Sequence, residues 1–196
     1  QLEEMPASSR KYPFVGFVQD REVGKDVLEV KELSKTIDGI KVLDNVSFYI
    51  NRLDKIALVG DNEAGQTALF KVLNEELTPD SGFFKWGVST SRSYFPKDNT
   101  EFFAGNDMNL VEWLRQYSKD QTESFLRGFL GRMLFSGDDV YKKVNVLSGG
   151  EKVRCMLSRM MMKEANVIML DQPPNHLDLE SITAVNNGIA DFKGTV

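Results

Sequence analysis

The sequence predicts an α/β fold with three parts: a core built on a mostly parallel sheet, a small antiparallel β layer and a helical insert. Short apolar runs alternate with helix-like stretches along much of the chain, which is typical of parallel sheets covered by helices. Two further apolar runs flank an Asp-Gly turn, as in a small antiparallel layer. The 196 residues, 41% of them hydrophobic, can bury one sizeable core, so one domain is expected.

The N-terminal part divides into a connector and the start of this domain. Residues 1–24 are punctuated by proline and serine and show no regular period, which predicts a connector. The domain is expected over residues 25–196. Its first strands are predicted at residues 27–30 and 46–50, because both runs are rich in β-branched and aromatic residues, with a turn at Asp38-Gly39 between them.

The later elements follow from the period of the apolar residues. A near-continuous apolar run predicts a buried parallel strand, whereas apolar residues spaced three and four apart predict helices. In chain order we expect a buried strand at residues 55–59 closed by Gly60, a helix over 67–77, a helical insert over about 105–146 with helices near 111–117 and 124–134, a helix from Ser148, a strand at 167–170 and a helix capped by Asp178 that runs to about Ile189.

Composition excludes several classes of protein. The chain has 24 Lys plus Arg against 29 Asp plus Glu and a net charge of −5, which argues against a globally basic nucleic-acid binder. Its single Cys and single His exclude disulfide scaffolds and argue against His/Cys zinc sites and histidine-based triads. No run approaches the roughly 18 apolar residues of a membrane span, and the N-terminus does not resemble a signal peptide. We therefore expect a soluble cytoplasmic protein without a membrane partner.

Residues 60–67 have the spacing of a phosphate-binding loop, G-x-x-x-x-G-K-[ST], between a predicted strand and a predicted helix. Backbone N–H groups of such a loop and of the helix start face an anion, and Thr67 can ligate Mg²⁺. Gln66 stands at the lysine position and Glu63 adds a carboxylate, so weak phosphate affinity is expected. The alternative is an ordinary strand-to-helix turn. The candidate nucleotide contacts are Gly60, Asp61, Asn62, Glu63, Ala64, Gly65, Gln66, Thr67 and Ala68.

Two further motifs give the sequence a family resemblance. The run Leu147-Ser148-Gly149-Gly150-Glu151 opens a helix, and Asp171 follows the strand at residues 167–170, where a P-loop fold places its Mg²⁺ ligand. With the glycine loop, these residues resemble the nucleotide-binding domain of ATP-binding-cassette (ABC) proteins: Walker A, signature and Walker B, followed by Asn175-His176-Leu177-Asp178 as the D-loop. The residues of the D-loop, the tract at residues 94–98 and the connector most resemble those of the second cassette of ABC-F proteins.

The resemblance implies a composite ATP site. Two cassettes, in one longer chain or in a dimer, would enclose ATP and Mg²⁺, with Thr67 and Asp171 as metal ligands. The signature residues Ser148, Gly149, Gly150 and Glu151 would contact the nucleotide bound on the partner cassette. The connector would be the end of an interdomain linker, and the domain would stop before the end of the strand that leads to the family's switch histidine. The ABC-F branch also implies the ribosome as a partner.

Four positions that the resemblance places around the nucleotide depart from the family pattern. Gln66 replaces the Walker A lysine, Lys97 replaces the Q-loop glutamine, and Ile37 stands where an aromatic residue stacks on adenine. Gln172 occupies the general-base position after Asp171. An amide can orient water but cannot accept its proton, and loss of a general base costs about 10² to 10⁴ in rate. Hydrolysis is therefore expected to be very slow.

Three functions remain open from the sequence. The first is an ABC-F-like cassette that binds Mg-ATP and hydrolyses it weakly or not at all. The second is a degenerate, non-enzymatic cassette that acts as an interaction module. The third is the ATPase subunit of an ABC transporter. The connector and the residues of the D-loop argue against this third function.

Overall fold

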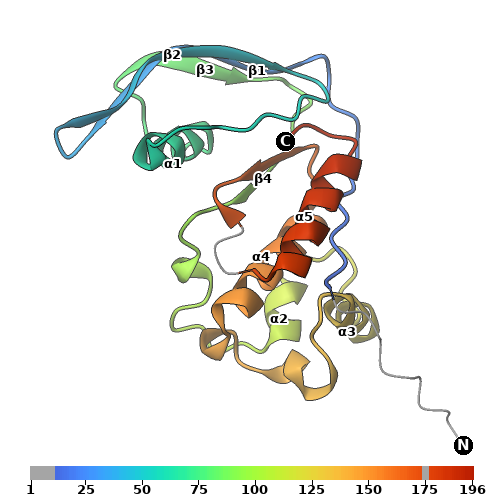
Figure 1. Ribbon diagram of the computed structural model, residues 1–196. Helices are drawn as coiled ribbons and strands as arrows, with labels where there is room; N and C mark the ends of the chain where they lie inside the picture. The colour runs from blue at the N-terminus through green and yellow to red at the C-terminus, as the bar shows by residue number, and fades with distance from the viewer. Residues whose placement is uncertain (1–11, 174–176) are drawn as a thin grey trace, which may run out of the picture.

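The computed structural model describes residues 12–173 and 177–196. An antiparallel sheet with one helix beneath it forms the upper part of Figure 1, and a group of helices forms the lower part. The elements are β1 (Asp26–Ile37), β2 (Ile40–Asn51), α1 (Glu63–Leu73), β3 (Ser81–Trp86), β4 (Arg92–Phe95), α2 (Leu110–Arg115), α3 (Glu123–Arg132), α4 (Gly149–Lys163), β5 (Val167–Leu170) and α5 (Leu179–Asp191), with 3-10 turns at Thr100–Phe102, Gly137–Tyr141 and Val144–Val146.

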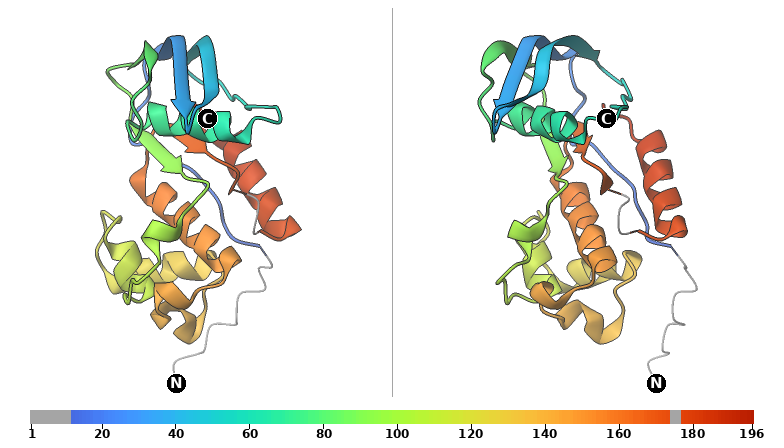
Figure 2. Two further views of the ribbon diagram at one scale, coloured as in Figure 1. Left: turned by 90° about the vertical axis from the view of Figure 1, so that its left-hand side faces the viewer. Right: turned by 60° about the vertical axis from the view of Figure 1, so that its left-hand side comes forward.

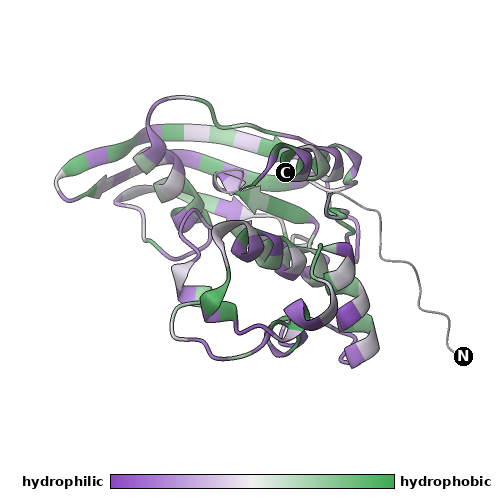
Figure 3. Ribbon diagram, turned by 60° about the horizontal axis from the view of Figure 1, so that its bottom comes forward, coloured by the Kyte–Doolittle hydropathy of each residue, from purple (hydrophilic) through white to green (hydrophobic). Residues whose placement is uncertain are grey.

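The antiparallel sheet confirms the predicted β layer and extends it. Its strand order is β2-β1-β3, and both pairings are antiparallel. The hairpin turns at Asp38 and Gly39, whose φ angles of 49° and 77° lie in the left-handed region that tight turns require. Hydrophobic and hydrophilic residues are interspersed along its strands (Figure 3), and the buried ones, including Val30 and Leu33, pack in one cluster with Leu69 and other residues of α1.

The parallel part of the core is formed by β4 and β5, which pair in register from Arg92 with Val167 to Phe95 with Leu170. The other edge of β5 meets the C-terminal residues, because Val167 forms a parallel bridge with Thr195. Val196 then continues toward the segment after β2: its N–H donates to the Asp54 carbonyl at 3.0 Å, and its carbonyl accepts from Ile56 N at 2.8 Å. The predicted α/β class with a parallel core is confirmed.

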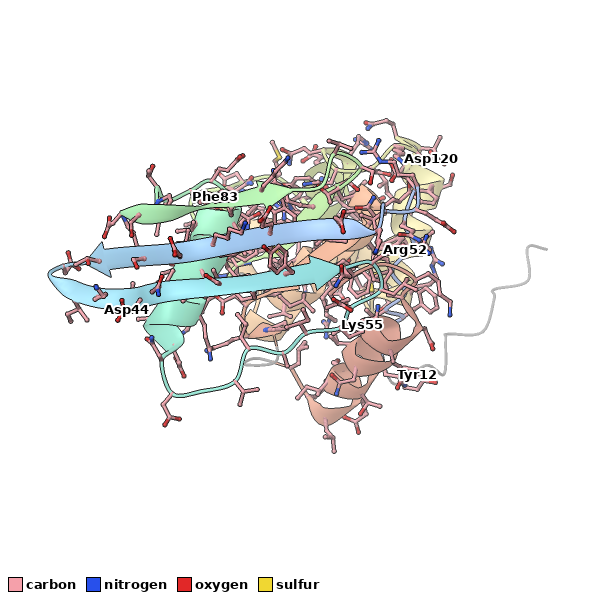
Figure 4. The ribbon with its side chains drawn as sticks, turned by 90° about the horizontal axis from the view of Figure 1, so that it is seen from above. Tyr12, Asp44, Arg52, Lys55, Phe83 and Asp120 are labelled. Atoms are coloured by element: carbon pink, nitrogen blue, oxygen red, sulfur yellow. The ribbon has the colours of Figure 1, made fainter. Side chains whose placement is uncertain are left out.

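The predicted buried strand at residues 55–59 is wrong for this structure. The segment is an extended coil, and its apolar side chains are exposed, with Val59 at 92%. Figure 4 shows this segment, from Arg52 past Lys55, running beside the antiparallel sheet before it reaches α1. A parallel strand needs a neighbour that supplies backbone hydrogen bonds along its length. Among the described residues, Ile56 is the one residue of this segment whose backbone bonds to Val196.

Helix α1 also differs from its prediction, since it covers Glu63–Leu73 instead of residues 67–77. It begins early because Asn62 caps it: the Asn62 side chain accepts a hydrogen bond from Gly65 N. The helix ends at the Asn74 C-cap, whose N–H donates to the carbonyls of Phe70 and Val72, and Leu77 lies beyond it.

The helical part follows the predicted positions within a few residues. Helices α2 and α3 lie inside the expected insert, and α4 and α5 begin directly after the predicted caps Ser148 and Asp178. Their apolar faces meet in one core cluster, in which Trp113 of α2, Leu126 of α3 and Met156 of α4 are each at most 1% exposed.

Residues 12–25 are extended and pack on this domain. Val15 and Phe17 are buried in the helical core, and the Phe17 ring meets Phe192 edge-on at a centroid distance of 6.1 Å. The blue segment in Figure 1 runs beside α5 accordingly. The described part of the predicted connector therefore contributes to the core, and its status as the end of an interdomain linker stays a prediction.

Candidate functional site

The glycine loop lies where β2 and α1 approach each other. Residues 60–62 are loop, and the candidate contacts from Glu63 to Ala68 lie in the first turns of α1. The Asn62 side chain bridges the two elements: Oδ1 accepts from Gly65 N at 2.9 Å, and Nδ2 donates to the Val42 carbonyl at 3.0 Å. One backbone N–H that a phosphate oxygen could use is therefore bonded within the loop.

Gly65 is required here by close packing. A Cβ at this position would lie 2.5 Å from the Val42 carbonyl oxygen and 2.4 Å from Asn62 Nδ2, distances that real contacts do not reach. Gly60 is different, because its φ of 144° lies in a region that L side chains rarely adopt, with open space around it. The two glycines of the motif thus serve different purposes, one steric and one conformational.

The two predicted metal ligands meet. Thr67 in α1 donates from Oγ1 to Asp171 Oδ2 at 2.7 Å, although the two residues are 104 positions apart. Asp171 follows β5 and is 1% exposed. A hydroxyl and a carboxylate oxygen suit Mg²⁺, which is commonly held by one or two protein oxygens together with phosphate oxygens. Within the described ranges no group of three or more His, Cys, Asp or Glu residues could hold a metal ion, so a magnesium ion here would depend on such phosphate oxygens.

Glu63, Lys97 and Gln172 form a polar cluster beside this pair. Lys97 Nζ lies 2.7 Å from Glu63 Oε2. The hydrogen bond and charge of Lys97, followed by a hydrogen bond from Gln172, hold the pKa of Glu63 below its ordinary value. The hydrogen bond to Glu63 in turn raises the pKa of Lys97. The structure therefore brings the predicted Q-loop and general-base positions to the glycine loop.

Gln66 turns back onto its own loop, because its Nε2 donates to the Gly60 carbonyl at 3.2 Å. Gln66, Asp171 and Gln172 are among the residues that line a cavity of about 710 Å³. The rest of its wall is largely apolar and comes from the exposed segment at residues 55–58, the antiparallel sheet, α1 and β5.

The signature residues lie elsewhere. Ser148 caps α4 in a capping box: its N–H donates to Glu151 Oε2 at 2.8 Å, and its Oγ accepts from Glu151 N at 3.3 Å. Both views of Figure 2 place the start of α4 among the lower helices, away from α1. Ser148 and Gly149 are exposed and Gly150 is half-buried. Their contact with a partner's nucleotide stays a prediction.

Two expectations stay predictions. Ile37 lies at the end of β1, paired with Ile40 and packed against the cluster beneath the antiparallel sheet, and its contact with adenine stays a prediction. Of the predicted D-loop, Asn175 and His176 lie outside the described residues, as do residues 1–11 of the predicted connector.

The contact that sequence reasoning missed is the pairing of Lys97 with Glu63. Both residues were candidate nucleotide contacts, but their opposite charges were the only indication that they meet. The capping role of Asn62 was also missed, although Asn before an apolar-periodic run is a recognised helix start.

Comparisons with known proteins point to one family. Residues 43–175 match the family described as ABC transporter. The chain is 65% identical over 196 residues to the uncharacterized ABC transporter ATP-binding protein YkpA of Bacillus subtilis, covering all of this chain and 36% of that protein. It is 39% identical over 197 residues to the probable ATP-binding protein YbiT of Escherichia coli O157:H7, a match that covers 100% of this chain and 37% of that protein. It is 32% identical over 205 residues to the energy-dependent translational throttle protein EttA of Mycobacterium tuberculosis, a match that covers 99% of this chain and 36% of that protein.

The chain thus spans about a third of the length of these relatives. Over the part of the chain that the structure describes, no helix has the length and apolar character needed to cross a membrane.

Proposed function

The chain belongs to the ABC transporter family, and from this membership and the geometry above we propose that it binds Mg-ATP at the start of α1 and hydrolyses it slowly or not at all. ATP binding is general in the family, and the relatives are of the ABC-F kind. The observation that carries the proposal is the Thr67–Asp171 pair, two oxygen donors 2.7 Å apart beside the glycine loop.

Binding would use groups that the structure already brings together. Thr67 and Asp171 would hold the metal, which supplies positive charge against the phosphates. The backbone N–H groups at the start of α1 would face the phosphates once the Asn62 side chain leaves Gly65 N. The Gln66 amide can donate a hydrogen bond but adds no charge.

Slow hydrolysis follows from Gln172. Its amide lies in the polar cluster beside Glu63 and can orient a water molecule without accepting a proton. Loss of a general base costs about 10² to 10⁴ in rate. ATP would therefore act mainly as a ligand that assembles cassettes.

We further propose that the site is completed by the signature of a second cassette and that the protein acts on the ribosome. The exposed start of α4 supports the first proposal. The second is supported by the ABC-F resemblance and by the name of the relative EttA, a translational throttle protein. A cytoplasmic location is part of the same proposal.

Calorimetric titration with ATP, with Mg²⁺ and with EDTA, tests the binding proposal. We expect saturable binding that Mg²⁺ strengthens. Thr67→Val should remove most of this strengthening, about tenfold or more in affinity, because valine lacks the hydroxyl oxygen that would hold the metal. Thr183→Val is the matched control: that hydroxyl donates to the Leu179 carbonyl within α5. Absence of ATP binding by the chain, alone and within the longer protein, would overturn the proposal.

The interaction-module alternative is favoured by Gln66, whose side chain bonds to its own loop. Changing Gln66→Lys and Gln172→Glu together in the complete protein separates the two functions. If ATP is a ligand of this site, ATP turnover should rise. If the cassette serves only as a docking module, turnover should stay unchanged.

A further inference from the structure

We propose that Glu63 and Lys97 form a latch over the glycine loop, in which Lys97 is the cation that receives the terminal phosphates of a nucleotide and Glu63 competes with them for it. This inference rests on the proposed nucleotide binding and adds a named phosphate-binding group and a built-in competitor. The latch is defined by the 2.7 Å contact between Lys97 Nζ and Glu63 Oε2.

The position of Lys97 fits this role. It follows β4, which pairs with β5, and Asp171 follows β5. Asp171 N donates to the Phe95 carbonyl at 2.9 Å, so the two strand ends are joined directly. Lys97 also lies within electrostatic reach of the Asp171 carboxylate, which contributes to its raised pKa. Its ammonium group is therefore near the oxygens that would hold the metal and the phosphates.

Charge at the loop favours Lys97 over Gln66 as the phosphate partner. The Gln66 side chain is neutral and bonded to Gly60. An ammonium group forms charge-assisted hydrogen bonds to phosphate, which are roughly twice as strong as neutral ones. A lysine supplied by the loop after β4 can thus take the place of one missing from α1.

Glu63 explains why this cation is not freely available. As the first residue of α1, its carboxylate is favoured by the positive end of the helix, and the same position is where an anion would bind. The Glu63 and Lys97 side chains are 61% and 37% exposed. Ion pairs at such exposure contribute little to stability, so a polyphosphate can displace Glu63.

ATP and AMP titrations of four single variants test the latch. Lys97→Gln should weaken ATP binding about tenfold and leave AMP binding within about twofold, because AMP lacks the terminal phosphates; a tenfold change is an ordinary effect for one lost charged contact. Lys97→Arg should retain most of the ATP affinity. Glu63→Gln should tighten ATP binding by about threefold or more, since both competition and repulsion are removed. Asp107→Asn, which removes a carboxylate 3.3 Å from Lys143 in the helical part, should change neither.

A nucleotide-free measurement tests the pair itself. In an NMR titration of labelled glutamate, the pKa of Glu63 should be below its ordinary value in the wild type and should rise in Lys97→Gln. An unchanged pKa in that variant overturns the latch, as does equal loss of ATP and AMP affinity or unchanged ATP affinity. Complete absence of ATP binding by the wild type would instead overturn the proposed function together with the latch, so the two failures can be told apart.

Discussion

Replacing Gly65 by alanine tests whether the start of α1 is fixed by its close approach to β2. The new Cβ would lie 2.5 Å from the Val42 carbonyl oxygen and 2.4 Å from Asn62 Nδ2. The Val42 carbonyl belongs to β2 and also accepts the hydrogen bond from Asn62, so neither neighbour can move without loss of the contact between the hairpin and the helix cap.

The expected free-energy change combines three effects. Alanine in a helix gains about 0.5–1 kcal/mol over glycine. Overpacking costs about 1–3 kcal/mol, and loss of the Asn62 cap costs about 1 kcal/mol. The sum is a net destabilisation of about 1–3.5 kcal/mol, although helix propensity alone predicts the opposite sign.

Urea unfolding measures this change. With a slope of about 1–3 kcal/mol per molar urea, the midpoint should fall by roughly 1 M at an unchanged slope. Gly128→Ala is the matched control, because Gly128 lies in α3 with nothing within 4 Å of its added Cβ; it should stabilise by about 0.5–1 kcal/mol. If both variants shift the midpoint upward alike, the steric reasoning is refuted.

Two further predictions concern helix caps. Ser148→Ala should lower the free energy of unfolding by about 1 kcal/mol, because it removes one half of the capping box with Glu151. Ser148→Thr should lower it by less, because threonine keeps the capping hydroxyl. Equal urea midpoints for the wild type and both variants would contradict this. Hydrogen bonds from the side chain and backbone of Ser181 hold the pKa of Asp178 below its ordinary value of 3.8, so its carboxylate contributes stability that is fully present above pH 3.8 and is lost as pH falls through the lowered pKa. The stability advantage of the wild type over Asp178→Asn should therefore shrink below pH 3.8 in urea titrations at several pH values, and an advantage that is constant with pH would exclude this linkage.

Local chemistry explains which parts of the fold could be predicted. The helix starts after Ser148 and Asp178 were predictable because each cap forms its bond within three residues. The strand β5 was predictable because its four apolar residues are all buried or nearly so. Residues 55–59 have the same pattern and are exposed, because strand formation there depends on a distant pairing partner, which no local period reports.

The same distinction applies to the candidate site. The meeting of Thr67 with Asp171 followed from a general rule, that acids at the carboxyl ends of parallel strands lie near the loops that bind phosphate. The meeting of Lys97 with Glu63 depends on the path of the loop after β4, which no sequence pattern determined. The sequence therefore predicted the metal pair and left the charge balance around the phosphates open.

Two groups at the start of α1 already stand where a phosphate would bind, and this has a consequence for binding. Asn62 occupies the Gly65 N–H, and Glu63 places a negative charge at the helix start. An incoming phosphate must displace both the Asn62 side chain and the Glu63 carboxylate. Loss of the Asn62 cap costs about 1 kcal/mol, which corresponds to roughly fivefold in affinity. In return, the phosphates gain Lys97, the metal pair and the freed Gly65 N–H group. Nucleotide binding is thus an exchange of internal contacts for external ones, so changes at Asn62 should shift stability and nucleotide affinity in opposite directions.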